Sequence, residues 1–223
     1  SHSPTGGAFG AYMFGIGNTE MLGVVVTGGI WLQVPRTLAM DWSGRLAPGV
    51  TAKDMMLHMI GRFGMNGGQY QAVEFAGEAV RALSMPERMT LANMSAEMGA
   101  QAGLIAADAT TVAHLRQCGV SEDRLNDALQ WRGDAGAEQE RFDFDASELS
   151  PQVAAPHSPA NVHAVGELAD VKPTIAYIGA CTGAKLEDLR AAATVLRGHQ
   201  VAAGVQLLVA PASAREQAQA ERE

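Results

Sequence analysis

Cys181 is the residue whose type and surroundings point most directly to chemistry, because it lies in a short polar turn between two regular elements. The apolar run 174–178 predicts a strand, and the charged, alanine-rich segment 186–196 predicts an amphipathic helix. Such a turn lies at the carboxyl end of a strand and at a helix N-terminus, where α/β sheets bind ligands. The helix dipole favours a thiolate there, which could bind a metal or act as a nucleophile. The alternative is a small buried residue without chemistry.

Asn93 and Glu97 form a second candidate, four residues apart in a segment that predicts a helix from Pro86 to Gly99. Their side chains would share one face of that helix. The neighbouring positions are mostly apolar, and a desolvated carboxyl group there suits proton exchange or contact with a metal-bound water. Alternatively, both residues lie at the edge of the apolar stripe and contact solvent.

His2 follows Ser1 and precedes a glycine-rich stretch, where it could hydrogen-bond a substrate, pair with a carboxylate, or have no special role. Cys118, near the end of a predicted helix, is interpreted as inert. His157 and His163 lack the spaced partners that a zinc site needs.

The composition restricts the class of protein. The chain has 223 residues, 47% of them apolar and 18% charged, which predicts a globular α/β protein with a sizeable core. A formal charge of −8 argues against a nucleic-acid surface, which needs clustered Lys and Arg. The longest apolar stretch, 21–34, is short and interrupted by polar residues and glycines, so we expect no membrane span. We therefore expect a cytoplasmic protein.

The elements that must position the candidate residues follow from hydrophobic periodicity and capping patterns. Alternation predicts a strand over 37–45, and Thr51–Asp54 resembles a capping box that opens a helix ending near Phe63. Asn18–Glu20 could cap a helix that buries Met21, Leu22, Val25 and Val26. Further strands are expected over 69–76, 104–107 and 205–209, and further helices over 77–83, 110–117 and from 214 to the end.

The segment from Val120 to Asp170 has a different character. Charges gather between residues 123 and 148, and Pro151, Pro156 and Pro159 are expected to break any regular element. We interpret the proline-rich stretch from residue 150 to residue 160 as a linker between two lobes.

Several segments in order resemble the aconitase superfamily, and most of all its 3-isopropylmalate dehydratase branch. The resemblance covers nearly the whole chain and is weakest between Val120 and Asp170. The segments that carry it are the Ser-His opening with its glycine-rich run 1–17, Gly49–Asp54, Glu74–Ser84, Asn93–Glu97 and Gly179–Thr182.

This resemblance implies an α/β fold of three-layer α/β/α lobes with mostly parallel sheets, incomplete at both ends. Residues 1–150 would hold the end of a first lobe and a second α/β lobe. Residues 151–171 would be a linker, and residues 172–223 would begin a third lobe that carries Cys181.

The resemblance also implies a 4Fe–4S cluster that is held by three cysteine thiolates and acts as a Lewis acid. Cys181 would be the first ligand, and the other two ligands lie outside this sequence. One cysteine cannot hold the cluster, so we expect this sequence to be an internal fragment that is inactive alone.

Roles for the other candidates come only from the resemblance. Glu97 would contact the bound water or the substrate hydroxyl, with Asn93 and Thr182 on the substrate and cluster side. Ser1 and His2 would belong to the loop that handles proton transfer and the leaving water. Gly183 stands where the family generally has Asn.

The activity implied is a hydro-lyase that isomerises 2-isopropylmalate and 3-isopropylmalate in leucine biosynthesis. Its substrate is a small hydroxy-dicarboxylic acid, and its partner would be a small swivelling subunit in a heterodimer. Related dehydratases acting on homoaconitate, methylmalate or dimethylmalate, and a cluster-free non-catalytic relative, remain alternatives. An RNA-binding role is disfavoured by the acidic balance.

Overall fold

The computed structural model describes residues 2–130, 132–134, 136–137, 140–180 and 182–222. The chain divides into two compact units, Ser1–Val165 and Gly166–Glu223, which are described separately. The division falls within 151–171, whose assignment as a linker stays a prediction. In the described part of the chain, no helix is both long and apolar enough to cross a membrane.

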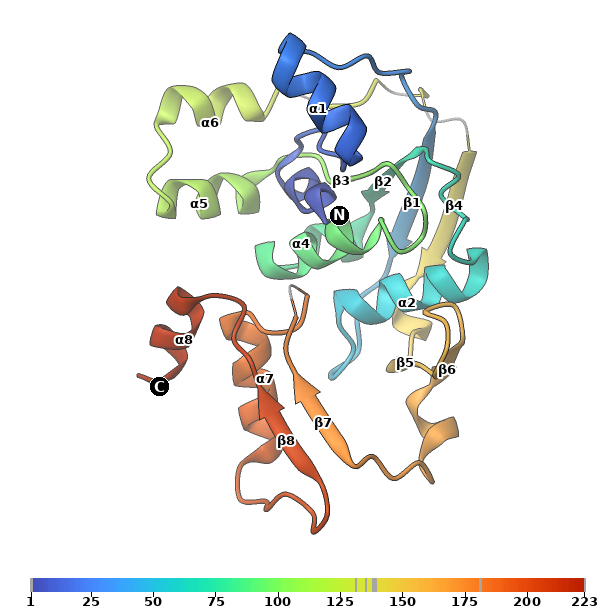
Figure 1. Cartoon of the computed structure of the whole chain (residues 1–223), viewed down its shortest axis with the longest axis vertical. Helices are drawn as coiled ribbons and strands as arrows, with labels where there is room; N and C mark the ends of the chain where they lie inside the picture. Colours follow the sequence, from blue (N-terminus) through green and yellow to red (C-terminus); the bar gives the residue numbers. More distant parts are fainter. Residues whose placement is uncertain (1, 131, 135, 138–139, 181, 223) are drawn as a thin grey trace. The chain divides into compact units, whose positions relative to one another are not determined.

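The first unit is built around a four-stranded parallel sheet (Figure 1). Its strands are β1 (Thr37–Ser43), β2 (Ala72–Ala76), β3 (Ala102–Leu104) and β4 (Glu140–Asp145), in the order β3-β2-β1-β4. All three pairings are parallel, with Leu38 of β1 opposite both Val73 of β2 and Glu140 of β4. The predicted α/β class with mostly parallel sheets is confirmed.

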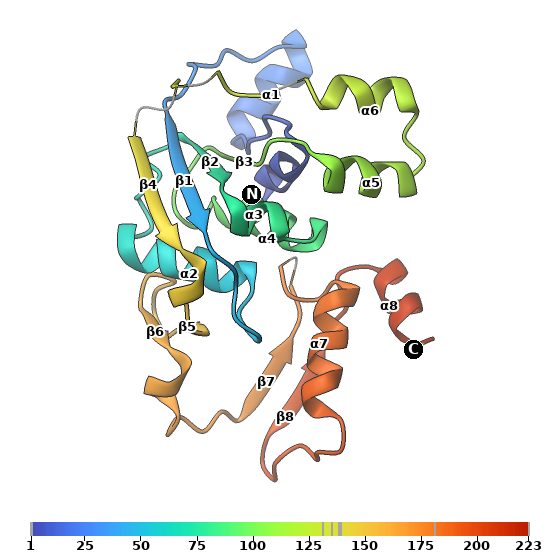
Figure 2. The ribbon, with the colours of Figure 1, turned by 180° about the vertical axis from the view of Figure 1, so that it is seen from behind.

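Helices precede, connect and follow these strands, and Figure 2 shows them from behind. They are the 3-10 helix η1 (Ser3–Phe9), α1 (Asn18–Thr27), α2 (Ala52–Phe63), α3 (Glu78–Ala82), α4 (Met85–Met94), α5 (Ala109–Gln117), α6 (Glu122–Ala128) and the 3-10 turn η2 (Ala146–Glu148).

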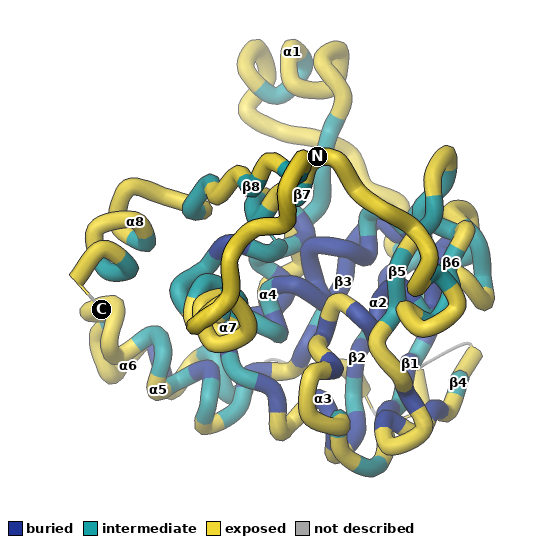
Figure 3. Tube along the Cα trace, turned by 90° about the horizontal axis from the view of Figure 1, so that it is seen from below, coloured by how far each residue is buried: buried dark blue, intermediate teal, exposed yellow. Residues whose placement is uncertain are grey.

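The core of this unit forms where α2 and α4 pack against the sheet, shown by the buried segments in Figure 3. The alternation predicted for β1 is confirmed, since Leu38, Met40 and Trp42 are buried. The predicted capping box is also confirmed, because Asp54 accepts hydrogen bonds from the backbone N–H and the hydroxyl of Thr51. A second Asp54 oxygen accepts the backbone N–H of Gln152 at 2.7 Å, which ties the start of α2 to a distant strand.

The predicted burial of the α1 face is wrong. The helix forms as expected, but Met21, Leu22, Val25 and Val26 are 51–75% exposed. Apolar periodicity predicts a helix and cannot show which surface it packs against, and within this unit the helix extends away from the sheet. Exposed apolar residues continue beyond it at Ile30, Trp31, Leu32 and Val34.

The segment 120–170 holds more regular structure than its charges and prolines predicted. Strand β4 was not expected, and it lies at the sheet edge, where charged side chains can remain exposed. The prolines do not prevent an antiparallel hairpin of β5 (Gln152–Ala154) and β6 (Val162–Ala164). Pro151 precedes β5, while Pro156 and Pro159 lie in the connection, where a missing N–H costs no ladder bond.

A buried ion pair that the sequence did not reveal links α4 to α5. The Arg88 side chain is fully buried, and its guanidinium donates to both Asp108 oxygens at 2.7 and 2.8 Å and to the Leu83 and Arg81 carbonyls. Asp108 is also the N-cap of α5 and accepts from Thr110 and Thr111. Burial raises the pKa of Asp108, but the hydrogen bonds and charge of Arg88, with those from the α5 N-terminus, outweigh it and lower the pKa overall.

The second unit is a small parallel β-α-β arrangement. The η3 turn (Val165–Leu168), whose first residue belongs to the first unit, leads to β7 (Ile175–Ile178), α7 (Leu186–Leu196), β8 (Gln206–Val209) and α8 (Ala214–Ala220). Strands β7 and β8 pair in parallel, with Ile175 opposite Gln206. The strand, turn, helix and strand predicted around Cys181 are therefore confirmed as elements.

Candidate active site

His2 and Glu97 lie together in the first unit. His2 Nδ1 is 3.8 Å from Glu97 Oε1, with side-chain exposures of 49% and 28%. Although Glu97 is partly exposed, its other oxygen, Oε2, is buried and has no hydrogen-bond partner among the described residues. A buried acceptor without a partner carries a desolvation cost that a donor from a ligand would relieve.

Thr5 connects this pair to Asn93. The Thr5 hydroxyl donates to the His2 carbonyl at 2.7 Å and accepts from Asn93 Nδ2 at 2.8 Å. Asn93 is only 2% exposed, so this hydrogen bond joins α4 to the His2 loop at a buried position. The sequence analysis missed Thr5, because its partner lies 88 residues away and no local pattern relates the two.

The backbone that carries His2 is held against the sheet by a close approach at Gly7. Its carbonyl accepts the Ile105 N–H at 2.9 Å, and a Cβ at Gly7 would lie 1.7 Å from the Gly103 carbonyl oxygen. Only glycine fits this contact between η1 and the end of β3.

Asn93 and Glu97 are not on one helix, and this prediction is wrong. Helix α4 ends at Met94, and Glu97 lies in the turn that follows. After the helix ends, the Ser95 hydroxyl donates a hydrogen bond to the Ala92 carbonyl at 2.7 Å. Gly99 adopts a left-handed conformation, with φ +76°, where the chain turns toward β3. The structure nevertheless relates both residues to the His2 loop, Glu97 through His2 and Asn93 through Thr5.

Ser1 and Cys181 lie outside the described residues. The neighbours of Cys181 are described: Thr182 is partly buried in the turn before α7, and Ala180 has φ +73°. This left-handed conformation is strained for a residue with a Cβ. A Cβ at Gly183 would lie 3.1 Å from the Gly179 carbonyl oxygen, so the turn accepts glycine there with the least adjustment.

Carboxylates of the chain itself accept hydrogen bonds from backbone N–H groups at the N-terminus of α7. The Lys185 N–H donates to Asp188 at 3.0 Å, and the Leu186 N–H donates to Glu216 at 2.6 Å. These carboxylates satisfy two of the N–H groups that an anionic ligand would use.

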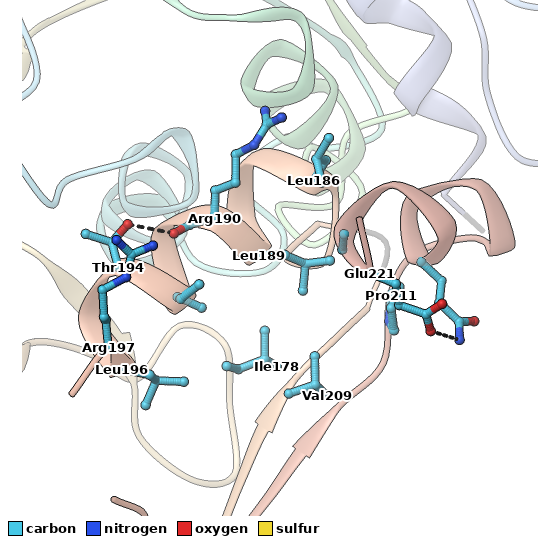
Figure 4. Close-up of a pocket in the computed structure, with 14 residues that line it drawn as sticks. Ile178, Leu186, Leu189, Arg190, Thr194, Leu196, Arg197, Val209, Pro211 and Glu221 are labelled. Carbon is cyan, nitrogen blue, oxygen red and sulfur yellow. Dashed lines mark hydrogen bonds between the residues drawn. The ribbon is translucent and has the colours of Figure 1, made fainter. Parts of the chain in front are cut away.

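A groove of about 690 Å³ lies between α7, α8 and the β7–β8 sheet (Figure 4). Ile178, Leu189 and Val209 line it, with Arg190 and Arg197 among its polar residues. In Figure 4, the Thr194 hydroxyl donates to the backbone carbonyl of Arg190, and the Gln217 amide donates to the Glu221 carboxylate, each at 2.8 Å. None of the predicted site residues that the structure describes lines this groove.

Metal ligands do not cluster in the described part of the chain, where no group of three His, Cys, Asp or Glu residues could hold an ion. Cys118 is exposed at the C-cap of α5. A 4Fe–4S cluster needs at least three thiolates, and this sequence has two cysteines in all.

Comparison with known protein families assigns this parallel α/β chain to a class. Residues 1–223 match the aconitase family (aconitate hydratase), and the chain belongs to this family.

Its curated relatives include enzymes of one type. The chain is 42% identical over 211 residues to the 3-isopropylmalate dehydratase large subunit of Moorella thermoacetica, covering 95% of this chain and 49% of that protein. It is 43% identical over 214 residues to the large subunit of Nitratidesulfovibrio vulgaris, covering 96% and 50%. A probable large subunit from Methanosarcina mazei is 41% identical over 218 residues, covering 97% and 51%. The chain thus spans about half the length of the curated relatives it matches.

Proposed function

We propose that this chain belongs to the large subunit of a hydro-lyase that interconverts 2-isopropylmalate and 3-isopropylmalate by losing and re-adding water. The observation that carries the proposal is the His2–Glu97 pair with its unpartnered, buried Glu97 oxygen. The names of the relatives give the substrate, and leucine biosynthesis would be the pathway.

Proton transfer is the task that the pair suits. With Nδ1 directed at Glu97, His2 keeps Nε2 for a substrate and can give a proton to a departing hydroxyl or take one from water on the return. The 3.8 Å separation is longer than a hydrogen bond, so the pair must close when substrate binds. Ser1 would act in the same loop.

Glu97 Oε2 would accept a hydrogen bond from the substrate hydroxyl or from the released water, which supplies the donor that this atom lacks. Asn93 would hold the His2 loop through Thr5, and Thr182 would lie on the substrate side. A 4Fe–4S cluster, when bound, supplies Lewis-acid chemistry to such a site, with Cys181 as one of its ligands.

The partner would be a small subunit, as the words "large subunit" in the relatives' names suggest. The compartment would be the cytoplasm. Because two cysteines cannot hold the cluster, the 223 residues alone would not turn over substrate.

The test is turnover of 3-isopropylmalate, followed by the ultraviolet absorbance of the alkene, in the complete gene product with its small subunit. Glu97→Gln should keep the cluster absorbance and lose on the order of 100-fold or more in rate, as expected for a general acid–base group. Wild-type turnover by this variant would remove Glu97 from the mechanism. Cluster absorbance that is missing from the wild-type protein would instead favour a cluster-free relative.

A further inference from the structure

A cavity of about 250 Å³ lies beside the His2–Glu97 pair in the first unit. It is lined from the glycine-rich run after His2, from the turn that carries Glu97 and from the loop before β2. The lining residues used below are Pro4, Tyr70, Ala96 and Gln101. Ala96 directly precedes Glu97, and Pro4 follows His2 by two residues. None of the described residues that line this cavity is charged, and we call it the Gln101 cavity.

Backbone hydrogen bonds hold the loop before β2 against the turn that carries Glu97. The Gly68 N–H donates to the Met98 carbonyl at 2.8 Å. The Tyr70 N–H donates to the Gly99 carbonyl at 2.9 Å. Because the two accepting residues directly follow Glu97, Tyr70 is fixed beside the candidate catalytic carboxylate.

The backbone at Tyr70 is strained. Gln69 and Tyr70 are both left-handed, with φ +43° and +57°, which is unfavourable for residues with a Cβ. Such strain persists where the surrounding structure fixes it, and it is concentrated at ligand-binding sites. The Tyr70 side chain is 61% exposed, and within the described part of the chain its hydroxyl makes no hydrogen bond. Burial therefore does not account for a tyrosine at this position, whereas contact with a ligand would.

Gln101 presents a donor to the same cavity. The residue is only 6% exposed, and its Oε1 accepts the hydroxyl of Tyr12. Burial raises the pKa of Tyr12 and the nearby Tyr70 adds to this effect, so the Tyr12 hydroxyl stays protonated and remains a donor. Since Tyr12 uses the amide oxygen, Gln101 Nε2 faces elsewhere, and it has no acceptor among the described residues. A largely buried N–H group without an acceptor would gain from a ligand that supplies one.

Two unused donors without an acidic side chain beside them suit a carboxylate, which only accepts hydrogen bonds. In an α-hydroxy acid, the carboxylate is bonded to the carbon that carries the hydroxyl. The group that binds this carboxylate therefore has to lie next to the group that binds the hydroxyl, which is Glu97 in the proposed function.

We propose that Gln101 Nε2 and the Tyr70 hydroxyl bind the carboxylate on the hydroxyl-bearing carbon of the substrate. This inference rests on the proposed function and names two residues that would position the substrate against Glu97.

The probes are three matched hydroxy acids, used as racemates: malate, 2-hydroxybutyrate and 3-hydroxybutyrate. In 3-hydroxybutyrate a methyl group replaces the carboxylate on the hydroxyl-bearing carbon, and in 2-hydroxybutyrate it replaces the other carboxylate. Each is titrated calorimetrically into the complete gene product with its small subunit. Titration needs no turnover, so it tests these contacts separately from the proposed dehydration. Wild type should bind malate about tenfold or more tightly than 3-hydroxybutyrate, since a hydrogen-bonded charge is lost.

Two variants remove the donors one at a time. Gln101→Glu keeps an acceptor for Tyr12 but replaces the donor by a negative charge, and should weaken malate and 2-hydroxybutyrate about tenfold or more. Tyr70→Phe removes only a hydroxyl from an exposed side chain and should weaken the same two ligands by about tenfold. Neither change should alter 3-hydroxybutyrate binding by more than about twofold, which also shows that folding is retained.

Tyr70→Gly separates the role of the side chain from that of the strain. Glycine relieves the left-handed conformation and should raise the urea concentration at the unfolding midpoint, yet malate binding should weaken as in Tyr70→Phe. Gln33→Glu is the matched control, because Gln33 is exposed and lines a neighbouring cavity of about 430 Å³ but not the Gln101 cavity. It should change the affinity of none of the three ligands.

Four results would overturn the proposal. They are failure of malate to bind wild type, equal binding of malate and 3-hydroxybutyrate, wild-type malate binding by both Gln101→Glu and Tyr70→Phe, and equal effects of Gln101→Glu and Gln33→Glu. If 3-isopropylmalate is not turned over but the expected pattern of malate binding is found, the dehydration falls and the carboxylate contacts stand.

Discussion

Replacing Thr5 by Val tests the connection between the His2 loop and α4. Valine keeps the branched shape of threonine but removes the hydroxyl that accepts from Asn93 at 2.8 Å and donates to the His2 carbonyl at 2.7 Å. The Asn93 amide is buried and loses this acceptor, whereas the His2 carbonyl lies in an exposed segment where water can replace the bond. We therefore expect a loss of about 1–2 kcal/mol in the free energy of unfolding of the first unit.

The assay is urea unfolding of the whole chain, with hydrogen exchange at the α4 amides reporting on the first unit separately. Thr5→Ser should stay within about 0.5 kcal/mol of wild type, because it keeps the hydroxyl. Thr19→Val, on the exposed face of α1, is a matched control with the same expectation.

A double-mutant cycle with Asn93→Leu makes the test specific. Removing both partners costs less than the sum of the single changes, so the two substitutions should be coupled by about 1 kcal/mol. Additivity within about 0.3 kcal/mol would refute the contact. In the complete gene product, Thr5→Val should also lower turnover more than it changes substrate affinity, because His2 would be less well positioned.

Three further changes have defined expectations. Asp108→Asn should cost about 2 kcal/mol at pH 7, a value reduced for the partial exposure of this carboxylate, because buried Arg88 loses its counter-charge. Its folded pKa is lowered, so the wild-type advantage should be complete above the ordinary Asp range near 3.8 and disappear as pH falls through the folded pKa, measured by urea unfolding from pH 7 to 2. Ala180→Gly should stabilise the second unit by about 0.5–1 kcal/mol, since glycine relieves φ +73°, measured by hydrogen exchange in β7. Cys181→Ser in the complete gene product should abolish stable cluster absorbance.

Each of these has a result that would count against it. A constant difference between wild type and Asp108→Asn across the pH range would show that the Asp108 charge does not stabilise the fold. A destabilised Ala180→Gly chain would mean that the Ala180 methyl group makes contacts worth more than the strain. Full cluster absorbance and turnover in Cys181→Ser would exclude Cys181 as a ligand.

Local patterns in the sequence predicted the elements that depend on neighbouring residues. The Thr51–Asp54 capping box, the helix end at Gly64 and the alternation in β1 all appear as expected, because caps and periodicity act within a few residues. Contacts between distant residues were not predictable. The pairing of β4 with β1, the exposure of α1 and the Thr5–Asn93 bond all depend on segments about 90 residues or more apart, or on surfaces that no local pattern describes.

In the candidate site, too, local sequence patterns predicted less than the contacts between distant residues that the structure shows. The spacing of Asn93 and Glu97 predicted one helix face, but the turn after Met94 places Glu97 elsewhere. That His2 and Glu97 serve one site was implied only by the family resemblance, and their proximity is seen in the structure. The Arg88–Asp108 pair had a partial local signal, since Asp108 lies two residues before the helix predicted over 110–117 and is the N-cap of the observed helix, which begins at Ala109.

The position of β4 has a consequence for how the protein is made. Leu38 of β1 pairs with Glu140 of β4, about 100 residues later in the chain. At translation rates of roughly 5–20 residues per second, one edge of β1 stays unpaired for about 5–20 s before β4 is synthesised. During that interval a strand carrying Leu38, Met40 and Trp42 presents unpaired backbone groups, which favour association with other nascent chains. Slow synthesis or loss of β4 should therefore lower the soluble yield before it alters the chemistry of the site.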